Sequence, residues 1–172
     1  MNELDMMAQL DSVDLSKVET SFPLLASGVV SCQVSAIEFK RDIEKKADAK
    51  PYLQVELTLV SPWKTVPRDG EPSKPVNPGD RGSKLVDRIY FGDYEDKRTG
   101  EIKKYGYDRM ATLREAAFGK ATEGARFSAI PQEMLGQTIT VELKFEAAPV
   151  NKDTKEVYGP RTSVGRYIKA KR

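Results

Sequence analysis

The chain has 172 residues, of which 39% are hydrophobic, so it is long enough for one domain with a modest core. Its 28 basic and 26 acidic residues nearly cancel, but residues 1–20 hold five acids and one base, which leaves residues 21–172 basic. There is no histidine and only one cysteine, which excludes Ser-His-Asp and Cys-His nucleophiles, HExxH zinc sites and intramolecular disulfides. We therefore expect a protein that is not an enzyme and has no cofactor and no metal.

No apolar run approaches the roughly 20 residues of a membrane span. The acidic start also differs from a secretory signal, which has basic residues before an apolar segment. We expect a cytoplasmic protein with no membrane partner.

Residues 1–21 form an acidic N-terminal arm. Its apolar residues, among them Met6, Met7 and Leu10, indicate a weak amphipathic helix or a docking segment, with a flexible or loosely packed arm as the alternative. The folded domain is expected to occupy residues 22–172.

Three strands are predicted in the first half of this domain. Alternating apolar and polar residues predict strands at 28–39, 52–60 and 84–94. A change of parity between Ala36 and Ile37 indicates either a bulge in the first strand or a switch of its buried face. Cys32 lies on the apolar face of that strand and is expected to be a small core residue.

One helix and two strands follow. Asp108 is predicted to cap a helix that runs to Phe118 and stops at Gly119. A short helical turn is expected within 127–135, followed by strands at 138–145 and 162–168.

The loop between the second and third strands, residues 61–82, is the most unusual segment. It carries Trp63, five prolines and four cations. This composition predicts a long, basic hairpin arm with an aromatic ring at its tip, a combination suited to a polyanion whose bases can stack.

Five strands with a helix between the third and fourth are the element order of an OB-fold, a five-stranded Greek-key barrel. Its ligand groove lies along strands two and three and beside the loops that join strands one to two and four to five. This chain concentrates basic and aromatic residues in those places.

The sequence resembles single-stranded-DNA-binding proteins of bacteriophages with an OB-fold, over roughly residues 28–168. The segments that carry the resemblance are LLASGVVSCQVSAIEFK, PYLQVELTLV, MATLREAAFG, MLGQTITVELKFE and VGRYI. It implies sequence-tolerant binding of single-stranded DNA in phage replication, recombination or repair, in the host cytoplasm. Self-association along the DNA and contacts with replication or recombination proteins stay open. Many members end in an acidic recruitment tail, whereas residues 166–172 here are basic.

Loop aromatics are candidates for base stacking, with packing against the loops as the alternative, and the neighbouring cations are candidates for phosphate contacts. The candidate residues are Trp63, Lys64, Arg68, Lys74, Arg81, Arg88, Tyr90, Tyr94, Lys103, Lys104, Tyr105, Tyr107, Arg109, Lys152, Lys155, Tyr158 and Arg161. By contrast, the phenylalanines at 39, 91, 118, 127 and 145 are assigned to the core.

Two other classes of function compete with nucleic-acid binding. A virion-structural or protein-interaction β-barrel would use Trp63 as an interface anchor. A metal enzyme would need a cation on Asp93, Glu95 and Asp96, which we interpret as a solvated turn. Gly119-Lys120 is not part of a P-loop, because Arg114 stands where that motif requires glycine.

Overall fold

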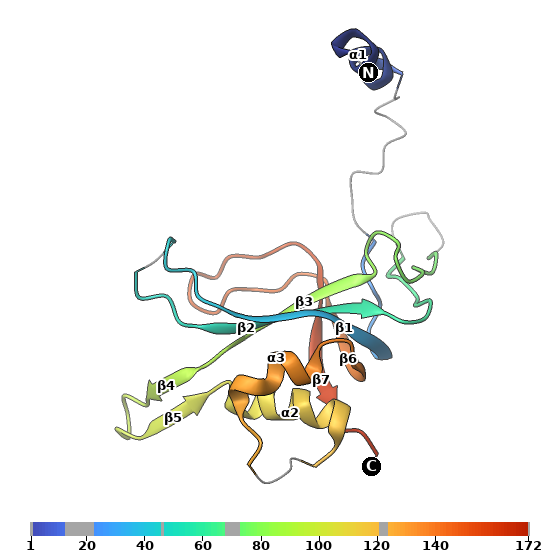
Figure 1. The fold of residues 1–172 in the computed structure, drawn as a ribbon. Coiled ribbons are helices and arrows are strands. Elements are labelled where there is room, and N and C mark those ends of the chain that lie inside the picture. Colours follow the sequence, from blue (N-terminus) through green and yellow to red (C-terminus); the bar gives the residue numbers. More distant parts are fainter. Residues whose placement is uncertain (1, 13–22, 46, 68–72, 121–123, 172) are drawn as a thin grey trace.

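The computed structural model describes residues 2–12, 23–45, 47–67, 73–120 and 124–171. The main element is a five-stranded antiparallel sheet with the order β3-β2-β1-β6-β7 (Figure 1). Its strands are β1 (Gly28–Lys40), β2 (Tyr52–Leu59), β3 (Lys84–Tyr90), β6 (Thr138–Glu146) and β7 (Arg161–Ile168). A two-stranded sheet joins β4 (Gly92–Glu95) to β5 (Ile102–Tyr105). The prediction of a mainly β protein is confirmed.

The helical segments are few. Helix α2 (Tyr107–Phe118) and helix α3 (Ile130–Met134), which the short 3-10 turn η2 (Phe127–Ala129) precedes, lie together on one side of the large sheet (Figure 1). Helix α1 (Glu3–Asp11) stands away from the sheet and buries none of its residues. Asn2 and Asp5 form a complete capping box at its start, so the helical alternative for the arm is confirmed there. Residues 13–21 of the predicted arm lie outside the described residues.

The core consists of the apolar residues that the strand patterns place on one face, together with the inner face of α2. A side chain on every second residue points to the same side of a strand, and the predicted inward positions are buried. They include Val30, Cys32 and Val34 in β1, Leu53, Val55, Leu57 and Leu59 in β2, Ile139, Val141 and Leu143 in β6, and Met110 and Leu113 in α2.

The predicted bulge in β1 is confirmed by a register shift between Val34 and Ala36 in its pairing with β2. The extra residue bends the strand. Residues 28–33 of β1 pair with β6, and residues 32–40 pair with β2, so one bent strand connects the two halves of the sheet.

The closed barrel is not confirmed. Within the part of the chain that the structure describes, β3 and β7 are the outer strands of the large sheet and share no strand pairing. In the described residues the large sheet is therefore open, and we name the space between its outer strands, β3 and β7, the seam.

The predicted strand at 84–94 is wrong in one respect, because it is two strands. β3 ends at Tyr90, and β4 starts at Gly92, whose φ of 145° is easily adopted only by glycine. The predicted charged loop at 96–106 also contains a strand, β5, which pairs with β4 across the Thr99-Gly100 turn.

The predicted cap of α2 is wrong as well. The N-cap is Gly106 in the left-handed conformation, and Asp108 lies in the first turn of the helix. An acid in the first turn still interacts favourably with the helix dipole. Gly119 follows the last residue of α2, as predicted.

We predict that Cys32 is nearly inert in the native protein. Its side chain is inaccessible, and burial raises the pKa of its thiol from 9.0 to about 11. Because the thiolate is the nucleophile, only about one native molecule in a thousand would carry it at pH 8, against about one in ten unfolded molecules. Alkylation with iodoacetamide should therefore be at least about 100-fold slower in buffer than in urea.

The matched control is Val29→Cys in a Cys32→Ala background, because Val29 is 50% exposed on the opposite face of the same strand. That thiol should react at similar rates in buffer and in urea. Equal rates for native and unfolded Cys32 would contradict the burial of this thiol.

Candidate nucleic-acid interface

A groove of about 610 Å³ lies beside the free edge of β3, and we name it the β3 groove. Its walls come from β3, β5, the start of α2 and β7. The lining residues are Asp87, Arg88, Ile89, Tyr90, Lys103, Lys104, Gly106, Asp108, Arg109 and Val164. Five of the predicted site residues are thus brought together here, namely Arg88, Tyr90, Lys103, Lys104 and Arg109.

Gly106 makes the β3 groove possible by letting the corner between β5 and α2 pass against the end of β3. Its φ is +84°, and a Cβ at this position would stand 1.9 Å from the carbonyl oxygen of Tyr90. No side chain fits at that distance, so only glycine allows the approach. The corner brings Lys103 and Lys104 beside Tyr90.

Tyr90 is the aromatic residue of the groove that is placed to stack on a ligand. It lies on the face of β3 opposite the buried Ile89, as its parity predicted, and is 40% exposed. Its ring lies 5.0 Å from that of the buried Tyr52, to which it is paired across the strands. Tyr90 is therefore supported on one side and open on the other.

Tyr52 is itself held from two sides. Its hydroxyl donates to Asp42 Oδ1 at 3.1 Å, and the Arg88 guanidinium lies 5.6 Å from its ring centroid. These contacts join the turn between β1 and β2 to the outer face of β3. The surface beneath Tyr90 is fixed by hydrogen bonding and cation–π attraction as well as by packing.

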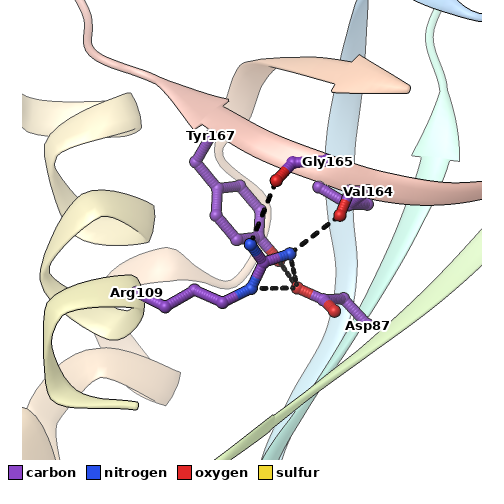
Figure 2. A network of polar contacts seen from close by, with 5 residues as sticks. All are labelled: Asp87, Arg109, Val164, Gly165 and Tyr167. Atoms are coloured by element: carbon purple, nitrogen blue, oxygen red, sulfur yellow. Dashed lines mark hydrogen bonds and ion pairs between the residues drawn. The ribbon is translucent and has the colours of Figure 1, made fainter. Parts of the chain in front are cut away.

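Arg109 crosses the seam between β3 and β7 (Figure 2). From α2, its Nε and Nη2 donate to Asp87 Oδ2 in β3 at 3.2 and 2.8 Å. Its Nη2 and Nη1 donate to the carbonyl oxygens of Val164 and Gly165 in β7 at 2.9 and 3.3 Å. Four of the five N–H donors of a guanidinium are thus engaged within the protein.

Tyr167 completes this network from β7. Its hydroxyl donates to Asp87 Oδ2 at 2.5 Å, and its ring centroid lies 5.1 Å from the Arg109 guanidinium. Burial, followed by the charge of Asp87 and this hydrogen bond, raises the pKa of Tyr167 well above its usual range. The hydroxyl therefore keeps its proton and acts as a donor at neutral pH.

Trp63 lies elsewhere. The loop that carries Trp63 joins the end of β2 to the start of β3. Tyr90 is the last residue of β3, so the length of this strand, about 20 Å at roughly 3.3 Å per residue, separates Tyr90 from the end of the loop. The Trp63 ring covers Gly28, where a Cβ would approach it to 2.7 Å, and its Nε1 donates to the Ala26 carbonyl at 2.9 Å. This packing favours a role for Trp63 in folding.

The described part of the loop at 61–82 folds against the chain instead of extending from it. Trp63 and Val76 exchange two backbone hydrogen bonds, and Leu25 bridges to Thr65. Thr65 also donates to the Lys74 carbonyl oxygen at 2.7 Å. Lys64 and Lys74 are exposed on this folded loop, Arg81 is exposed just before β3, and Arg68 lies outside the described residues.

Tyr107 is part of an aromatic row at the start of α2. The ring centroid of Tyr107 is 6.0 Å from that of Phe91 and 5.1 Å from that of Phe127, and the ring of Phe91 lies 5.6 Å from that of Phe39. Tyr107 is half-buried, which favours packing over stacking on a ligand. Phe39 and Phe127 are 39% and 41% exposed, so their assignment to the core is wrong.

The remaining candidates are spread over two regions. Lys152, Lys155 and Tyr158 lie in the exposed loop between β6 and β7, and Arg161, at the start of β7, pairs with Glu146 at 3.3 Å. Tyr105 follows Lys104 in β5, and Tyr94 in β4 is paired with Lys103 across the two strands.

Sequence reasoning missed two residues that shape the groove, Asp87 and Tyr52. Asp87 shares the inward parity of Leu85 and Ile89, and a charged residue on the buried face of a strand was the available signal. Tyr52 lies on the outward face of β2 and is buried by residues of β3 and of the turn before β2, so its own strand pattern gave no signal.

No model of a known protein family matches this chain, and none of the curated proteins is similar to it in sequence. Among the described residues, no group of three or more cysteine, aspartate or glutamate side chains is arranged to hold a metal ion. None of the described helices has the length and apolar character needed to cross a membrane.

We predict that Trp63→Ala mainly destabilises the fold. The truncation leaves a cavity over Gly28 and removes the hydrogen bond to Ala26, with an expected loss of about 3 kcal/mol of unfolding free energy. Trp63→Phe keeps most of the packing and should lose only about 1 kcal/mol for the missing donor. Urea unfolding followed by circular dichroism measures both changes.

Tyr158→Ala is the control, because Tyr158 is an exposed aromatic residue in another loop. It should change stability by less than about 0.5 kcal/mol. Wild-type stability in Trp63→Ala would show that the Trp63 packing is not important for folding.

Proposed function

We propose that this chain is a sequence-tolerant single-stranded-DNA-binding protein without catalytic activity, acting in phage DNA replication, recombination or repair in the host cytoplasm. The observation that carries the proposal is the β3 groove, where Tyr90, Arg88, Lys103 and Lys104 converge from separate parts of the chain.

The chemistry of the groove suits unpaired nucleotides. A base can stack on the open side of Tyr90, and aromatic stacking tolerates any base because every base has a π face. Lys103, Lys104 and Arg88 line the same groove and can neutralise phosphates there, which releases counterions from the nucleic acid. Lys103 Nζ also lies 3.6 Å from Asp96 Oδ2, in an ion pair whose lysine is exposed and which a phosphate can replace at little cost. Bases inside a duplex are already stacked and do not offer these faces to a protein.

The strand order supports an OB-type fold. Five antiparallel strands in the order β3-β2-β1-β6-β7, with α2 between β3 and β6, correspond to a five-stranded Greek-key barrel opened between its third and fifth strands. In such folds the oligonucleotide crosses strands two and three. The β3 groove and the Tyr52–Tyr90 pair lie on those strands here.

The alternative is a virion-structural or protein-interaction β-barrel that binds no nucleic acid. That alternative needs Trp63 as an exposed anchor, whereas Trp63 packs against Gly28 and bonds to Ala26. The groove therefore supports nucleic-acid binding better than the loop supports an interface.

The proposal is tested by titrating a fluorescent oligothymidine and a duplex of equal length with the protein at two salt concentrations. We expect binding to the single strand to be tighter than to the duplex and to weaken steeply as salt rises. Equal binding to both forms would reject the single-strand preference, and no binding to either at low salt would favour the interaction barrel.

We predict that groove variants separate stacking from charge. Tyr90→Ala should lose about 1–3 kcal/mol of binding free energy and leave the salt dependence unchanged, because it removes a stacked base and no charge. The pair Lys103→Ala and Lys104→Ala should lower the slope of log K against log salt by about 0.7 for each phosphate that is no longer neutralised. Fluorescence anisotropy across a salt series measures both quantities.

Lys74→Ala is the matched control, since Lys74 is an exposed lysine in the loop at the opposite end of β3. It should change neither affinity nor slope beyond a small long-range effect. If Lys74→Ala weakens binding as much as the groove lysines do, the β3 groove is not the site.

A further inference from the structure

The seam between β3 and β7 is bridged by side chains. Asp87 belongs to β3, Val164, Gly165 and Tyr167 belong to β7, and Arg109 reaches both strands from α2 (Figure 2). We name Asp87, Arg109 and Tyr167 the clasp.

We propose that the clasp is a positioning device that sets the shape of the β3 groove, and that Arg109 acts through Asp87 and β7 instead of contacting phosphate. This inference rests on the proposed function of the groove. According to this inference, Asp87 favours binding although it is an acidic residue in a site for a polyanion.

The donors of Arg109 are the first reason. Its bonds to Asp87, Val164 and Gly165 hold the guanidinium in place, and its side chain is 32% exposed. A phosphate could take this guanidinium only by breaking those bonds and leaving Asp87, which is 15% exposed, without its cation. Leaving a largely buried charge unpaired is strongly unfavourable.

The position of Arg109 in the chain is the second reason. It follows Gly106 by three residues and lies in the first turn of α2, directly after the segment that carries Lys103 and Lys104. Fixing Arg109 to β3 and β7 therefore fixes the corner that sets these lysines beside Tyr90. Without the clasp, the corner has fewer restraints and the lysines shift relative to the ring.

The third reason is that two of the three clasp residues, Asp87 and Arg109, are also walls of the groove. They line it beside Val164, which accepts a hydrogen bond from Arg109, and beside Ile89 and Tyr90. A change in the distance between β3 and β7 is therefore a change in the shape of the site itself.

A comparison of two aspartates tests the proposal. Asp87 and Asp108 both line the β3 groove, but only Asp87 belongs to the clasp. If charge alone mattered, Asp87→Asn and Asp108→Asn would both strengthen oligothymidine binding, because each removes a negative charge from an anion site. We expect Asp108→Asn to bind as well as wild type or slightly better, and Asp87→Asn to bind on the order of 10-fold more weakly because its stacking and phosphate-binding groups are misplaced.

Arg109→Met adds a second readout. If Arg109 contacted a phosphate, its removal would lower the salt slope by about 0.7. If Arg109 is a positioning residue, Arg109→Met lowers affinity at every salt concentration and leaves the slope at the wild-type value, because the shifted Lys103 and Lys104 still lie beside the strand and neutralise its phosphates. Stronger binding by Asp87→Asn, or a reduced slope in Arg109→Met, would overturn the proposal.

Hydrogen–deuterium exchange tests the clasp without nucleic acid, so its failure can be told apart from failure of the proposed function. Asp87→Asn and Arg109→Met should speed exchange in residues 102–109 while exchange in β1 and β2 stays at the wild-type rate. Asp108→Asn removes only the favourable interaction of an acid with the dipole of α2, so it should leave β1 and β2 unchanged and speed exchange at 102–109 less than the clasp variants do. Faster exchange throughout the sheet would indicate a general loss of stability, and unchanged exchange at 102–109 would indicate no positioning effect; either result would reject the clasp.

Discussion

Strands β3 and β7 are the two outer strands of the large sheet. Paired strands are joined by a ladder of backbone hydrogen bonds, whereas β3 and β7 are joined by side chains that bridge the seam between them. A strand edge leaves N–H and C=O groups without strand partners, and these groups need other partners or water. Arg109 supplies donors to two β7 carbonyl oxygens and joins them to a carboxylate of β3. In the proposed clasp, the shape of the groove and the placement of the groove lysines depend on this contact.

The electrostatics of the contact explain why an acid can occupy the inner face of a strand. Asp87 stands between Leu85 and Ile89 in a pattern that would otherwise be apolar, and a buried carboxylate is costly unless it is paired and hydrogen-bonded. Oδ2 of Asp87 accepts from Arg109 and from Tyr167, so one oxygen joins three elements of the fold. Breaking a fully buried pair costs about 3–5 kcal/mol, and the partial exposure of Arg109 places this one below that range.

The parts of the fold that the sequence predicted are those governed by local periodicity. Residues 52–60 and 138–145 alternate regularly enough to predict which face is buried, and the structure buries the apolar residues of that face except Phe145, which is half-buried. β5 was missed because four residues with two lysines carry little pattern, and their pairing with β4 depends on a turn at Gly100. The cap at Asp108 was wrong because the tight approach of Gly106 to Tyr90, which starts the helix earlier, involves a contact distant in sequence.

The same limit applies to the site. Arg109 and Trp63 were both selected because they lie in or beside charged loops. Composition does not reveal that Arg109 bonds to Asp87 and Val164. Nor does it reveal that Trp63 packs on Gly28 and bonds to Ala26. A binding residue needs a free group and a fixed position at once. Trp63 has a fixed position but uses its ring and its N–H in folding, whereas Tyr90 is held by Tyr52 beneath it and keeps one face open. For the proposed function, the support under its ring, more than the kind of ring or the charge of its loop, makes Tyr90 a better candidate than Trp63 for stacking on a base.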